Sequence, residues 1–285
     1  MIPGAFAYHR PTSVNEAVSL LSSLGEDARP LAGGHSLIPL MKLRLAAPSD
    51  LIDLGAIKDL KGIRADGNDI VIGATVTQAE IIGSELLASK LPILRETSLQ
   101  IADPQVRYVG TIGGNVANGD PGNDMPAVMI ALNATYHVAG KSGERRIQAR
   151  SFYQGAYVTA LHAGEIVTAI RIPGLAKHGY AYEKLKRKVG DYATAAAAVI
   201  LTMDGGSVRT CSIGLTNVAD TPLYAEAACR LIIGSTLDAA TVKNAVLAAE
   251  KITSPASDRR GTPHYRTKMA GVMLSRALAR AKSRA

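Results

Sequence analysis

The stretch RPLAGGHSLIPLMKLR, residues 29–44, carries two adjacent glycines followed by a histidine and a serine. A second stretch of this kind, VGTIGGNVANGDPGND, lies at residues 109–124. Each glycine pair follows a short apolar segment, and neither AGGHS nor TIGGN contains a lysine or an arginine. Glycine accepts positive φ and lets an anion approach the backbone amides. The two stretches therefore predict two amide-lined loops that bind the two phosphates of one dinucleotide between two subdomains.

The side chains beside these glycines suit a phosphate site. They are His35 and Ser36 in the first stretch, and Thr111 and Asn115 in the second. Each can donate a hydrogen bond to a phosphate oxygen that the amide dipoles already attract. Glycine pairs are also common in turns, so either pair alone would more often be structural. The prediction depends on the similar context of both pairs.

Other nucleotide and metal motifs are absent or incomplete. Gly140-Lys141-Ser142 resembles the end of a P-loop, but position 135 is a threonine and the segment joins two predicted strands. The G-x-G-x-x-G fingerprint is absent, so a Rossmann site is not expected. The six histidines form no metal-binding pattern. We therefore expect no metal site and no catalytic residue in this chain.

Composition excludes several classes of protein. A chain of 285 residues with 47% hydrophobic and 20% charged residues predicts two or three globular domains. The absence of tryptophan and a content of 4% aromatic residues leave few platforms for stacking bases, which argues against a single-stranded nucleic-acid binder. There is no signal-peptide pattern and no apolar run long enough to span a membrane. We expect a cytoplasmic protein.

Net charge and cysteine content restrict the possible functions less than the motifs do. The net charge is +8, with basic residues concentrated in EKLKRK (183–188) and in the stretch from Asp258 onward. These two segments are candidate contacts for an acidic partner subunit or for the inner face of the cytoplasmic membrane. Cys211 and Cys229 cannot hold an iron–sulfur cluster alone, and we expect them to be buried thiols.

Periodicity divides the chain into three parts. Ser13 and Glu16 have capping-box spacing at the start of a helix, and Gly25 follows its apolar face. Asp66-Gly67 predicts a hairpin. The last third reads as an antiparallel meander followed by helices over residues 223–233, 238–252 and 264–283. We predict an α+β fold with two α/β subdomains over residues 1–55 and 56–176, and a third domain over residues 177–285. One face of the last helix groups apolar residues at helical spacing: Ala270, Met273, Leu274, Ala277 and Leu278.

The two glycine stretches and the segments GYAYEKLKRKVGDYATAAAAV and IGLTNVADTPL closely resemble the FAD-binding medium subunits of the molybdenum hydroxylases, the family of xanthine dehydrogenase. The resemblance runs from MIPGAFAYHRP to YRTKMAGVML, and it is greatest to the branch whose complexes oxidise carbon monoxide at molybdenum and copper. It implies the FAD-binding fold of the p-cresol methylhydroxylase type, followed by a C-terminal domain of antiparallel sheet and helices.

The resemblance also implies which residues hold non-covalent FAD. Asp124 matches an acid that binds ribityl or ribose hydroxyls, although it could instead cap a helix at its N-terminus. Lys184 matches a lysine near the flavin ring, although a solvated strand lysine would look the same. Tyr192 matches a tyrosine against the isoalloxazine, although such residues more often pack in a domain core. Val167 aligns with an apolar residue near the flavin. The residues that match the pyrophosphate contacts are Ala32, Gly33, Gly34, His35, Ser36, Thr111, Ile112, Gly113, Gly114 and Asn115.

The function implied by this resemblance is electron transfer. Electrons would come from two [2Fe–2S] clusters in a small partner subunit, after oxidation of carbon monoxide at the molybdopterin and copper of a large one. They would leave FAD for an external acceptor such as a quinone. The implied assembly is a dimer of heterotrimers. Three alternatives stay open: the same role in a hydroxylase of aldehydes or heteroaromatics, a free-standing flavin oxidase with FAD linked through His35, and a non-enzymatic binding module.

Overall fold

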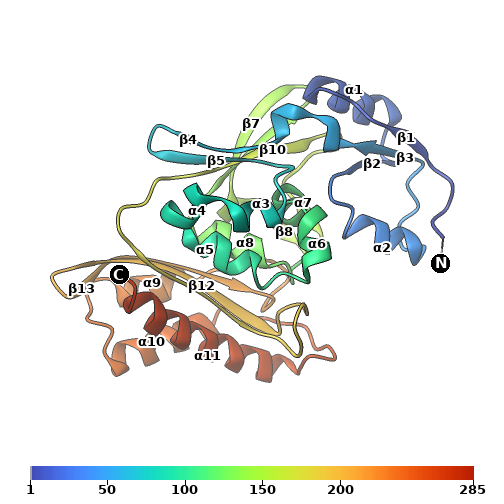
Figure 1. Cartoon of the computed structure of the whole chain (residues 1–285). Helices are drawn as coiled ribbons and strands as arrows, with labels where there is room; N and C mark the ends of the chain where they lie inside the picture. Colours follow the sequence, from blue (N-terminus) through green and yellow to red (C-terminus); the bar gives the residue numbers. More distant parts are fainter. Residues whose placement is uncertain (1) are drawn as a thin grey trace.

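The computed structural model describes residues 2–285, so Met1 lies outside the described part of the chain. Its elements form stacked layers: a five-stranded sheet, a layer of short helices, a four-stranded sheet, and three C-terminal helices (Figure 1). A three-stranded sheet from the N-terminal part of the chain sits beside the first layer. Two strands, β8 (Tyr153–Gly155) and β9 (Val158–Thr159), pair separately. The expected α+β architecture, a mixed part of sheets and helices followed by a domain of antiparallel sheet and helices, is confirmed.

The N-terminal part is a small α/β unit. Strands β1 (Ala7–His9) and β2 (Ala28–Leu31) flank β3 (Asp50–Asp53), and both pairs are parallel. Helix α1 (Val14–Leu24) begins where the Ser13 hydroxyl accepts the amide of Glu16, and it ends at Gly25 with φ of +78°. The predicted Ser13 cap and the end of this helix are confirmed, but the capping box is not complete, because the Glu16 carboxylate accepts the Thr12 amide instead of the Ser13 amide.

The middle part holds the five-stranded antiparallel sheet in the order β4-β5-β10-β6-β7. The predicted hairpin joins β4 to β5 through Gly67, whose φ is +60°. The Thr77 capping box at the start of helix α3 (Gln78–Gly83) is complete. The strands are β4 (Ile63–Asp66), β5 (Asp69–Gly73), β6 (Thr135–Gly140), β7 (Gly143–Gln148) and β10 (Ile166–Ile172).

Short helices fill the space between this sheet and the C-terminal one (Figure 1). They are α3 (Gln78–Gly83), α4 (Glu85–Lys90), α5 (Pro92–Ser98), α6 (Pro104–Val109), α7 (Ile112–Ala117) and α8 (Asp124–Ala131). Helix α2 (Leu37–Lys42) lies apart from this layer, beside the N-terminal sheet, and 3₁₀ turns occur at η1 (Leu54–Ala56), η2 (Lys58–Leu60) and η3 (Ala149–Ser151). Gly214 allows α8 to pack closely on the C-terminal sheet, because a Cβ there would lie 2.1 Å from the carbonyl oxygen of Ala127.

The C-terminal part is the predicted meander with helices on its outer face. Its sheet has the order β11-β12-β13-β14, and every pair is antiparallel. The strands are β11 (Gly179–Leu185), β12 (Ala195–Asp204), β13 (Ser207–Thr216) and β14 (Leu223–Tyr224), and the helices are α9 (Glu226–Ile232), α10 (Ala239–Glu250) and α11 (Pro263–Lys282). The predicted apolar face of α11 is buried, and both cysteines are buried free thiols.

Two local predictions are wrong. The second glycine stretch is not a loop at Ile112–Asn115, because these residues open helix α7 and Thr111 caps it. The helix expected from residue 223 begins at Glu226, because the chain first adds the two residues of β14 to the sheet. Across residues 2–285, no helix combines the length and the apolar character that a membrane span needs.

Candidate functional site

A cavity of about 620 Å³ lies where the three parts of the chain meet. Loop 32–36 and the start of α7 form one wall, and β10, β11 and the loop after β11 contribute the others. Every predicted site residue lines it except Ile112, which is fully buried in the core. A volume of this size is within the range of cofactor pockets, which is about 300–1,000 Å³. Residues up to 160 positions apart in the sequence therefore surround one space, as a cofactor site requires.

The first glycine stretch presents free amides to this cavity. Within residues 2–285, none of the backbone N–H groups of residues 33–37 donates a hydrogen bond to another group of the chain. Gly34 has φ of +71°, a conformation that glycine adopts without strain. A run of unpaired amides around a residue with positive φ forms an anion-binding concavity. This wall therefore fits one or both phosphates of a dinucleotide.

The second stretch does not form such a nest, contrary to the prediction. The amides of Ile112 and Gly113 donate to the carbonyl oxygens of Val76 and Ala74, and those of Gly114 and Asn115 donate to Thr111. What faces the cavity here is the N-terminal end of α7, with its partial positive charge, together with the side chains of Thr111 and Asn115. The Thr111 hydroxyl still has its own hydrogen to donate.

The glycines instead bring backbone segments together. A Cβ on Gly33 would lie 2.2 Å from the carbonyl oxygen of Val109 and 2.7 Å from the Cα of Gly110. A Cβ on Gly113 would lie 2.5 Å from the carbonyl oxygen of Ala74. Gly33 thus allows the first stretch to pack directly against the residues before α7, and Gly113 allows α7 to pack against Ala74, directly after β5. The close approach that the glycines permit is between parts of the protein as well as toward a ligand.

Asp124 is the buried acid of the cavity. Its carboxylate accepts hydrogen bonds from the Tyr182 hydroxyl at 2.5 Å and from Lys184 Nζ at 2.9 Å. Burial raises the pKa of Asp124, whereas the Lys184 charge and the Tyr182 hydroxyl oppose that shift. A carboxylate has about four acceptor positions, so Asp124 keeps capacity for the hydroxyls of a sugar or ribityl chain. Asn123 occupies the N-cap of α8, so the alternative role of Asp124 as that cap is wrong.

The environments of Lys184 and Tyr192 rule out the purely structural roles considered for them from sequence. The Lys184 side chain is 1% exposed and donates to Asp124 and to the carbonyl oxygen of Gln100, so it is not a solvated strand lysine. Tyr192 is 45% exposed and lies in the loop between β11 and β12, so it is not a core residue of the sheet. Its ring packs against Gly122, where an added Cβ would lie 2.8 Å from the ring atom Cδ1. The ring centre lies 5.6 Å from the Arg260 guanidinium carbon. Val167 lines the cavity from β10, and His35 is exposed at its edge.

Two tyrosines of this region are missing from the sequence prediction. Tyr182 stands two residues before Lys184 on β11, so their side chains share one face of the strand, and this spacing could have identified it. Tyr157 lines the cavity with φ of +60°, and burial together with Asp120 raises its pKa to about 12. Tyr157 lies in the turn between β8 and β9, and no local sequence pattern predicted its place in the cavity lining.

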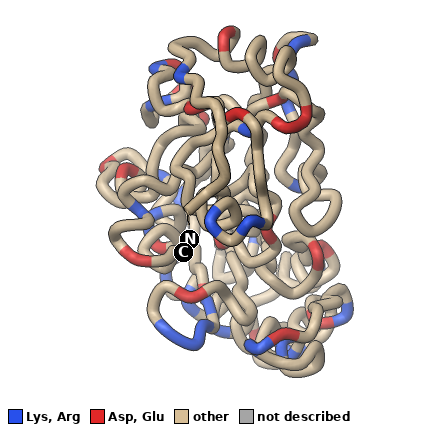
Figure 2. The backbone as a smooth tube through the Cα atoms, turned by 90° about the vertical axis from the view of Figure 1, so that its right-hand side faces the viewer, with Lys and Arg blue, Asp and Glu red and all other residues tan. Residues whose placement is uncertain are grey.

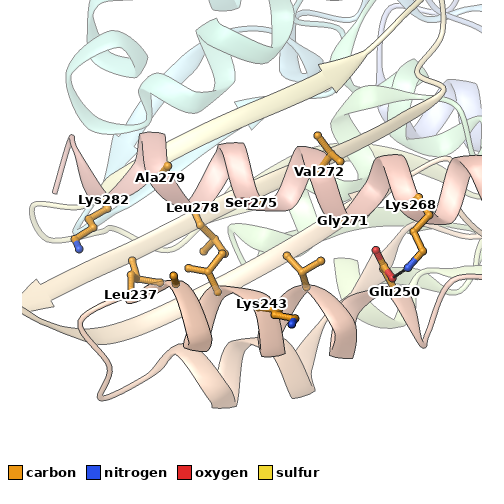
Figure 3. A pocket seen from close by; sticks show the side chains of 13 residues that line it. Leu237, Lys243, Glu250, Lys268, Gly271, Val272, Ser275, Leu278, Ala279 and Lys282 are labelled. Carbon is orange, nitrogen blue, oxygen red and sulfur yellow. Dashed lines mark hydrogen bonds and ion pairs between the residues drawn. The ribbon is translucent and has the colours of Figure 1, made fainter.

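A second cavity, of about 760 Å³, lies between α10 and α11 (Figure 3). It contains no predicted site residue, and valine, leucine and alanine side chains make up much of its wall. Two of its lysines are occupied within the chain: Lys268 pairs with Glu250 at 2.5 Å, and Lys282 donates to the carbonyl oxygen of Thr236 at 2.7 Å. Its acid, Glu250, is already paired with Lys268, and its described lining residues include no run of unpaired amides like that of residues 33–37, so the first cavity is the candidate dinucleotide site.

The predicted basic segments are partly used inside the protein. Figure 2 shows acidic and basic residues interspersed over most of the chain, with longer basic stretches at the lower end, where the C-terminal part lies. Within these stretches Lys184 and Arg266 are buried. Arg280 and Arg284 pair with Glu96 on α5. These four residues are therefore structural contacts rather than free surface charges.

Comparisons with known proteins give one family. Residues 4–175 match the family model described as the FAD-binding domain in molybdopterin dehydrogenase, and residues 180–281 match the C-terminal domain of the CO dehydrogenase flavoprotein. The chain is 66% identical to the carbon monoxide dehydrogenase medium chain of Afipia carboxidovorans, covering 100% of this chain and 99% of the relative. It is 48% identical to that of Hydrogenophaga pseudoflava, covering 98% and 97%. A chain in the crystal structure of cyanide-inactivated Cu,Mo-CO dehydrogenase superposes with a TM-score of 0.99 at 66% identity, with both chains fully covered.

Proposed function

The chain belongs to the FAD-binding subunits of the molybdopterin dehydrogenases, the molybdenum hydroxylases, and we propose that it is the flavin-carrying electron-transfer subunit of a carbon monoxide dehydrogenase. The observation that carries this proposal is the match along the whole chain to relatives of that name, at 66% and 48% identity. The relatives are oxidoreductases. The cavity supports the proposal independently, because its free amides and buried acid fit the pyrophosphate and hydroxyls of FAD.

In this proposal the chemistry is divided among three kinds of subunit. Carbon monoxide is oxidised at the molybdopterin and copper of a large subunit, and a small subunit carries two [2Fe–2S] clusters. This chain is the point at which the electrons leave the complex for an external acceptor, a quinone. The complex is a dimer of heterotrimers in the cytoplasm, with the inner membrane face as an alternative location. FAD, when bound, supplies a carrier that takes up and releases electrons singly or in pairs.

The residues of this chain bind and orient the cofactor. The amides of residues 33–37 hold the pyrophosphate, and the N-terminal end of α7, on the same wall, attracts its negative charge. Asp124 accepts hydroxyl hydrogen bonds, and it fixes the Lys184 ammonium in the cavity wall. A buried cation at that wall stabilises negative charge that develops on a reduced ring nearby.

Whether FAD is bound non-covalently tests this role directly. We expect acid precipitation of the purified complex to release all of its yellow colour into the supernatant, because His35 only contacts the cofactor. The complex should oxidise carbon monoxide with a quinone analogue, whereas the isolated chain should not. Colour retained in the acid pellet would indicate a covalent flavin oxidase, and carbon monoxide turnover by the isolated chain would contradict an electron-relay subunit.

Tyr192 should determine which acceptors reach the flavin. A nicotinamide must lie flat on the ring, because hydride transfer needs reacting atoms about 3–3.5 Å apart. We place the exposed Tyr192 ring over that face, whereas a quinone needs access only to the ring edge. Tyr192→Ala should alter the flavin absorption spectrum and leave quinone-analogue turnover nearly intact. Tyr108→Ala, which removes another exposed tyrosine outside the cavity lining, is the control. A spectrum and acceptor preference equal to those of the control would refute this placement.

A further inference from the structure

The outer edge of strand β11 is closed by side chains rather than by another strand. β11 is the end strand of its sheet, so the backbone groups of Tyr180 and Tyr182 that point away from β12 have no strand partner. Buried backbone groups of this kind need partners from elsewhere in the chain. Glu96 on α5 accepts the Tyr182 amide at 2.7 Å, and Gln100 donates to the Tyr182 carbonyl oxygen at 3.1 Å. Helix α5 and the residues after it therefore replace the missing strand.

The same Glu96 is held from its other side by two arginines near the end of α11. Its Oε2 accepts from Arg284 at 2.8 Å and lies 3.3 Å from Arg280. Arg284 also donates to the carbonyl oxygen of Tyr180 and lies over the Tyr180 ring at 4.4 Å. The Glu96 side chain is 15% exposed, so solvent replaces these contacts poorly. One carboxylate thus joins α5, β11 and α11.

β11 carries the two groups that hold the buried acid of the cavity. Its Tyr182 hydroxyl and its Lys184 ammonium bond to the two oxygens of Asp124. The Tyr182 residue that Glu96 fixes by its backbone is therefore the residue that reaches Asp124 by its side chain. A shift of this strand by a fraction of an ångström would lengthen both bonds to Asp124 and move Lys184 in the cavity wall.

We propose that Glu96 is a positioning residue of the flavin site, which sets the place of Asp124 and Lys184 by fixing the edge of β11. Glu96 does not line the cavity, so it acts without touching the cofactor. This inference rests on the proposed function, because the ligand whose binding it controls is FAD. It also gives the basic residues Arg280 and Arg284 a role inside the chain instead of at a membrane or partner surface.

The test compares Glu96→Ala with Glu96→Gln in the assembled complex, from which FAD is removed and then titrated back. The alanine variant leaves the Tyr182 amide without its acceptor and removes one carboxylate partner from each arginine, although Arg280 keeps Glu183 and Arg284 keeps the Tyr180 carbonyl oxygen. We expect the dissociation constant of FAD to rise at least about tenfold. The flavin absorption spectrum should shift as well, because Lys184 moves. The glutamine variant keeps an acceptor oxygen for the Tyr182 amide, and we expect it to recover most of the affinity and the wild-type spectrum.

The matched control is Glu250→Ala, which removes another carboxylate paired with a cation, 12% exposed and located on α10, with no hydrogen bond to β11 among the described residues. It should lower the thermal unfolding temperature without changing FAD affinity or spectrum. If Glu96→Ala binds FAD like this control, the inference is wrong. Should Glu96→Ala fail to assemble, Gln100→Leu removes the second bond to Tyr182, and control-like FAD binding by that variant would equally overturn the inference. A wild-type complex that binds no FAD would instead overturn the proposed function.

Discussion

Gly33→Val should eliminate FAD binding and sharply reduce the yield of folded chain. The first atom of the new side chain would overlap the carbonyl oxygen of Val109 and the Cα of Gly110, which are backbone atoms that cannot rotate away. The chain can relieve the overlap only by separating the first glycine stretch from α7, and that separation opens the cavity wall. The effect does not come from positive φ, because in this pair only Gly34 has it. Even Gly33→Ala should reduce FAD affinity at least about a hundredfold, as expected for overpacking that costs about 3 kcal/mol.

The control for this prediction is Gly83→Ala. Gly83 ends α3, and a Cβ there would meet no atom within 4 Å. It should bind FAD like the wild type, as fluorescence titration would show. Gly33→Ala with a normal complement of flavin would refute the tight contact between the two stretches.

Asp124→Ala should strongly destabilise the folded chain. It leaves the Lys184 ammonium, which is 1% exposed, without its counter-charge, and leaves the Tyr182 hydroxyl without its acceptor. Removing one partner of a buried ion pair costs about 3–5 kcal/mol of the free energy of unfolding. FAD affinity should fall in addition, by about 1–3 kcal/mol for hydroxyls left unpaired. Urea unfolding of the isolated chain and flavin titration of the complex measure the two effects separately.

A compensating variant tests the cause. Asp124→Leu combined with Lys184→Met removes both charges, and it should recover much of the unfolding free energy lost in Asp124→Ala because no buried charge is left unpaired. It should not recover FAD binding. Glu226→Ala, which breaks the exposed pair with Arg230, should cost at most about 1 kcal/mol. A double variant as unstable as Asp124→Ala would show that the ion pair is not the reason for the loss.

The sequence was most informative where structure is set locally. Helix α1 follows from a cap at Ser13, an apolar face and a terminal glycine, all within one short segment. Helix α7 could not be predicted in the same way, because two glycines inside it lower its intrinsic helix propensity. It forms because Gly113 packs on Ala74 and because its first amides bond to the chain around β5. Those contacts come from residues distant in sequence, which a local pattern cannot show.

The candidate site was likewise predicted only in part: its residues were identified, but most of their contacts were not. The glycine stretches were predicted from their own sequence pattern and Asp124 through family resemblance, and residues of all three segments line one cavity. The contacts that these residues make could not be predicted from sequence. The amides of the second stretch are hydrogen-bonded within the protein, and the Tyr182 hydroxyl bonds to Asp124, 58 positions away in the sequence. That each of these residues contacts FAD stays a prediction, as do the boundaries at residues 55 and 176.

The covered edge of β11 also affects how this chain meets other chains. An open, regular edge strand invites a second molecule to add its own strand, which is a common route to aggregation. Here the long edge is blocked by Glu96, Gln100 and Arg284, and the opposite edge of the sheet is β14, only two residues long. Newly made copies thus have little template for strand exchange with one another. In the proposed complex, where this chain assembles with two other kinds of subunit, a sheet that resists pairing with itself favours the correct contacts.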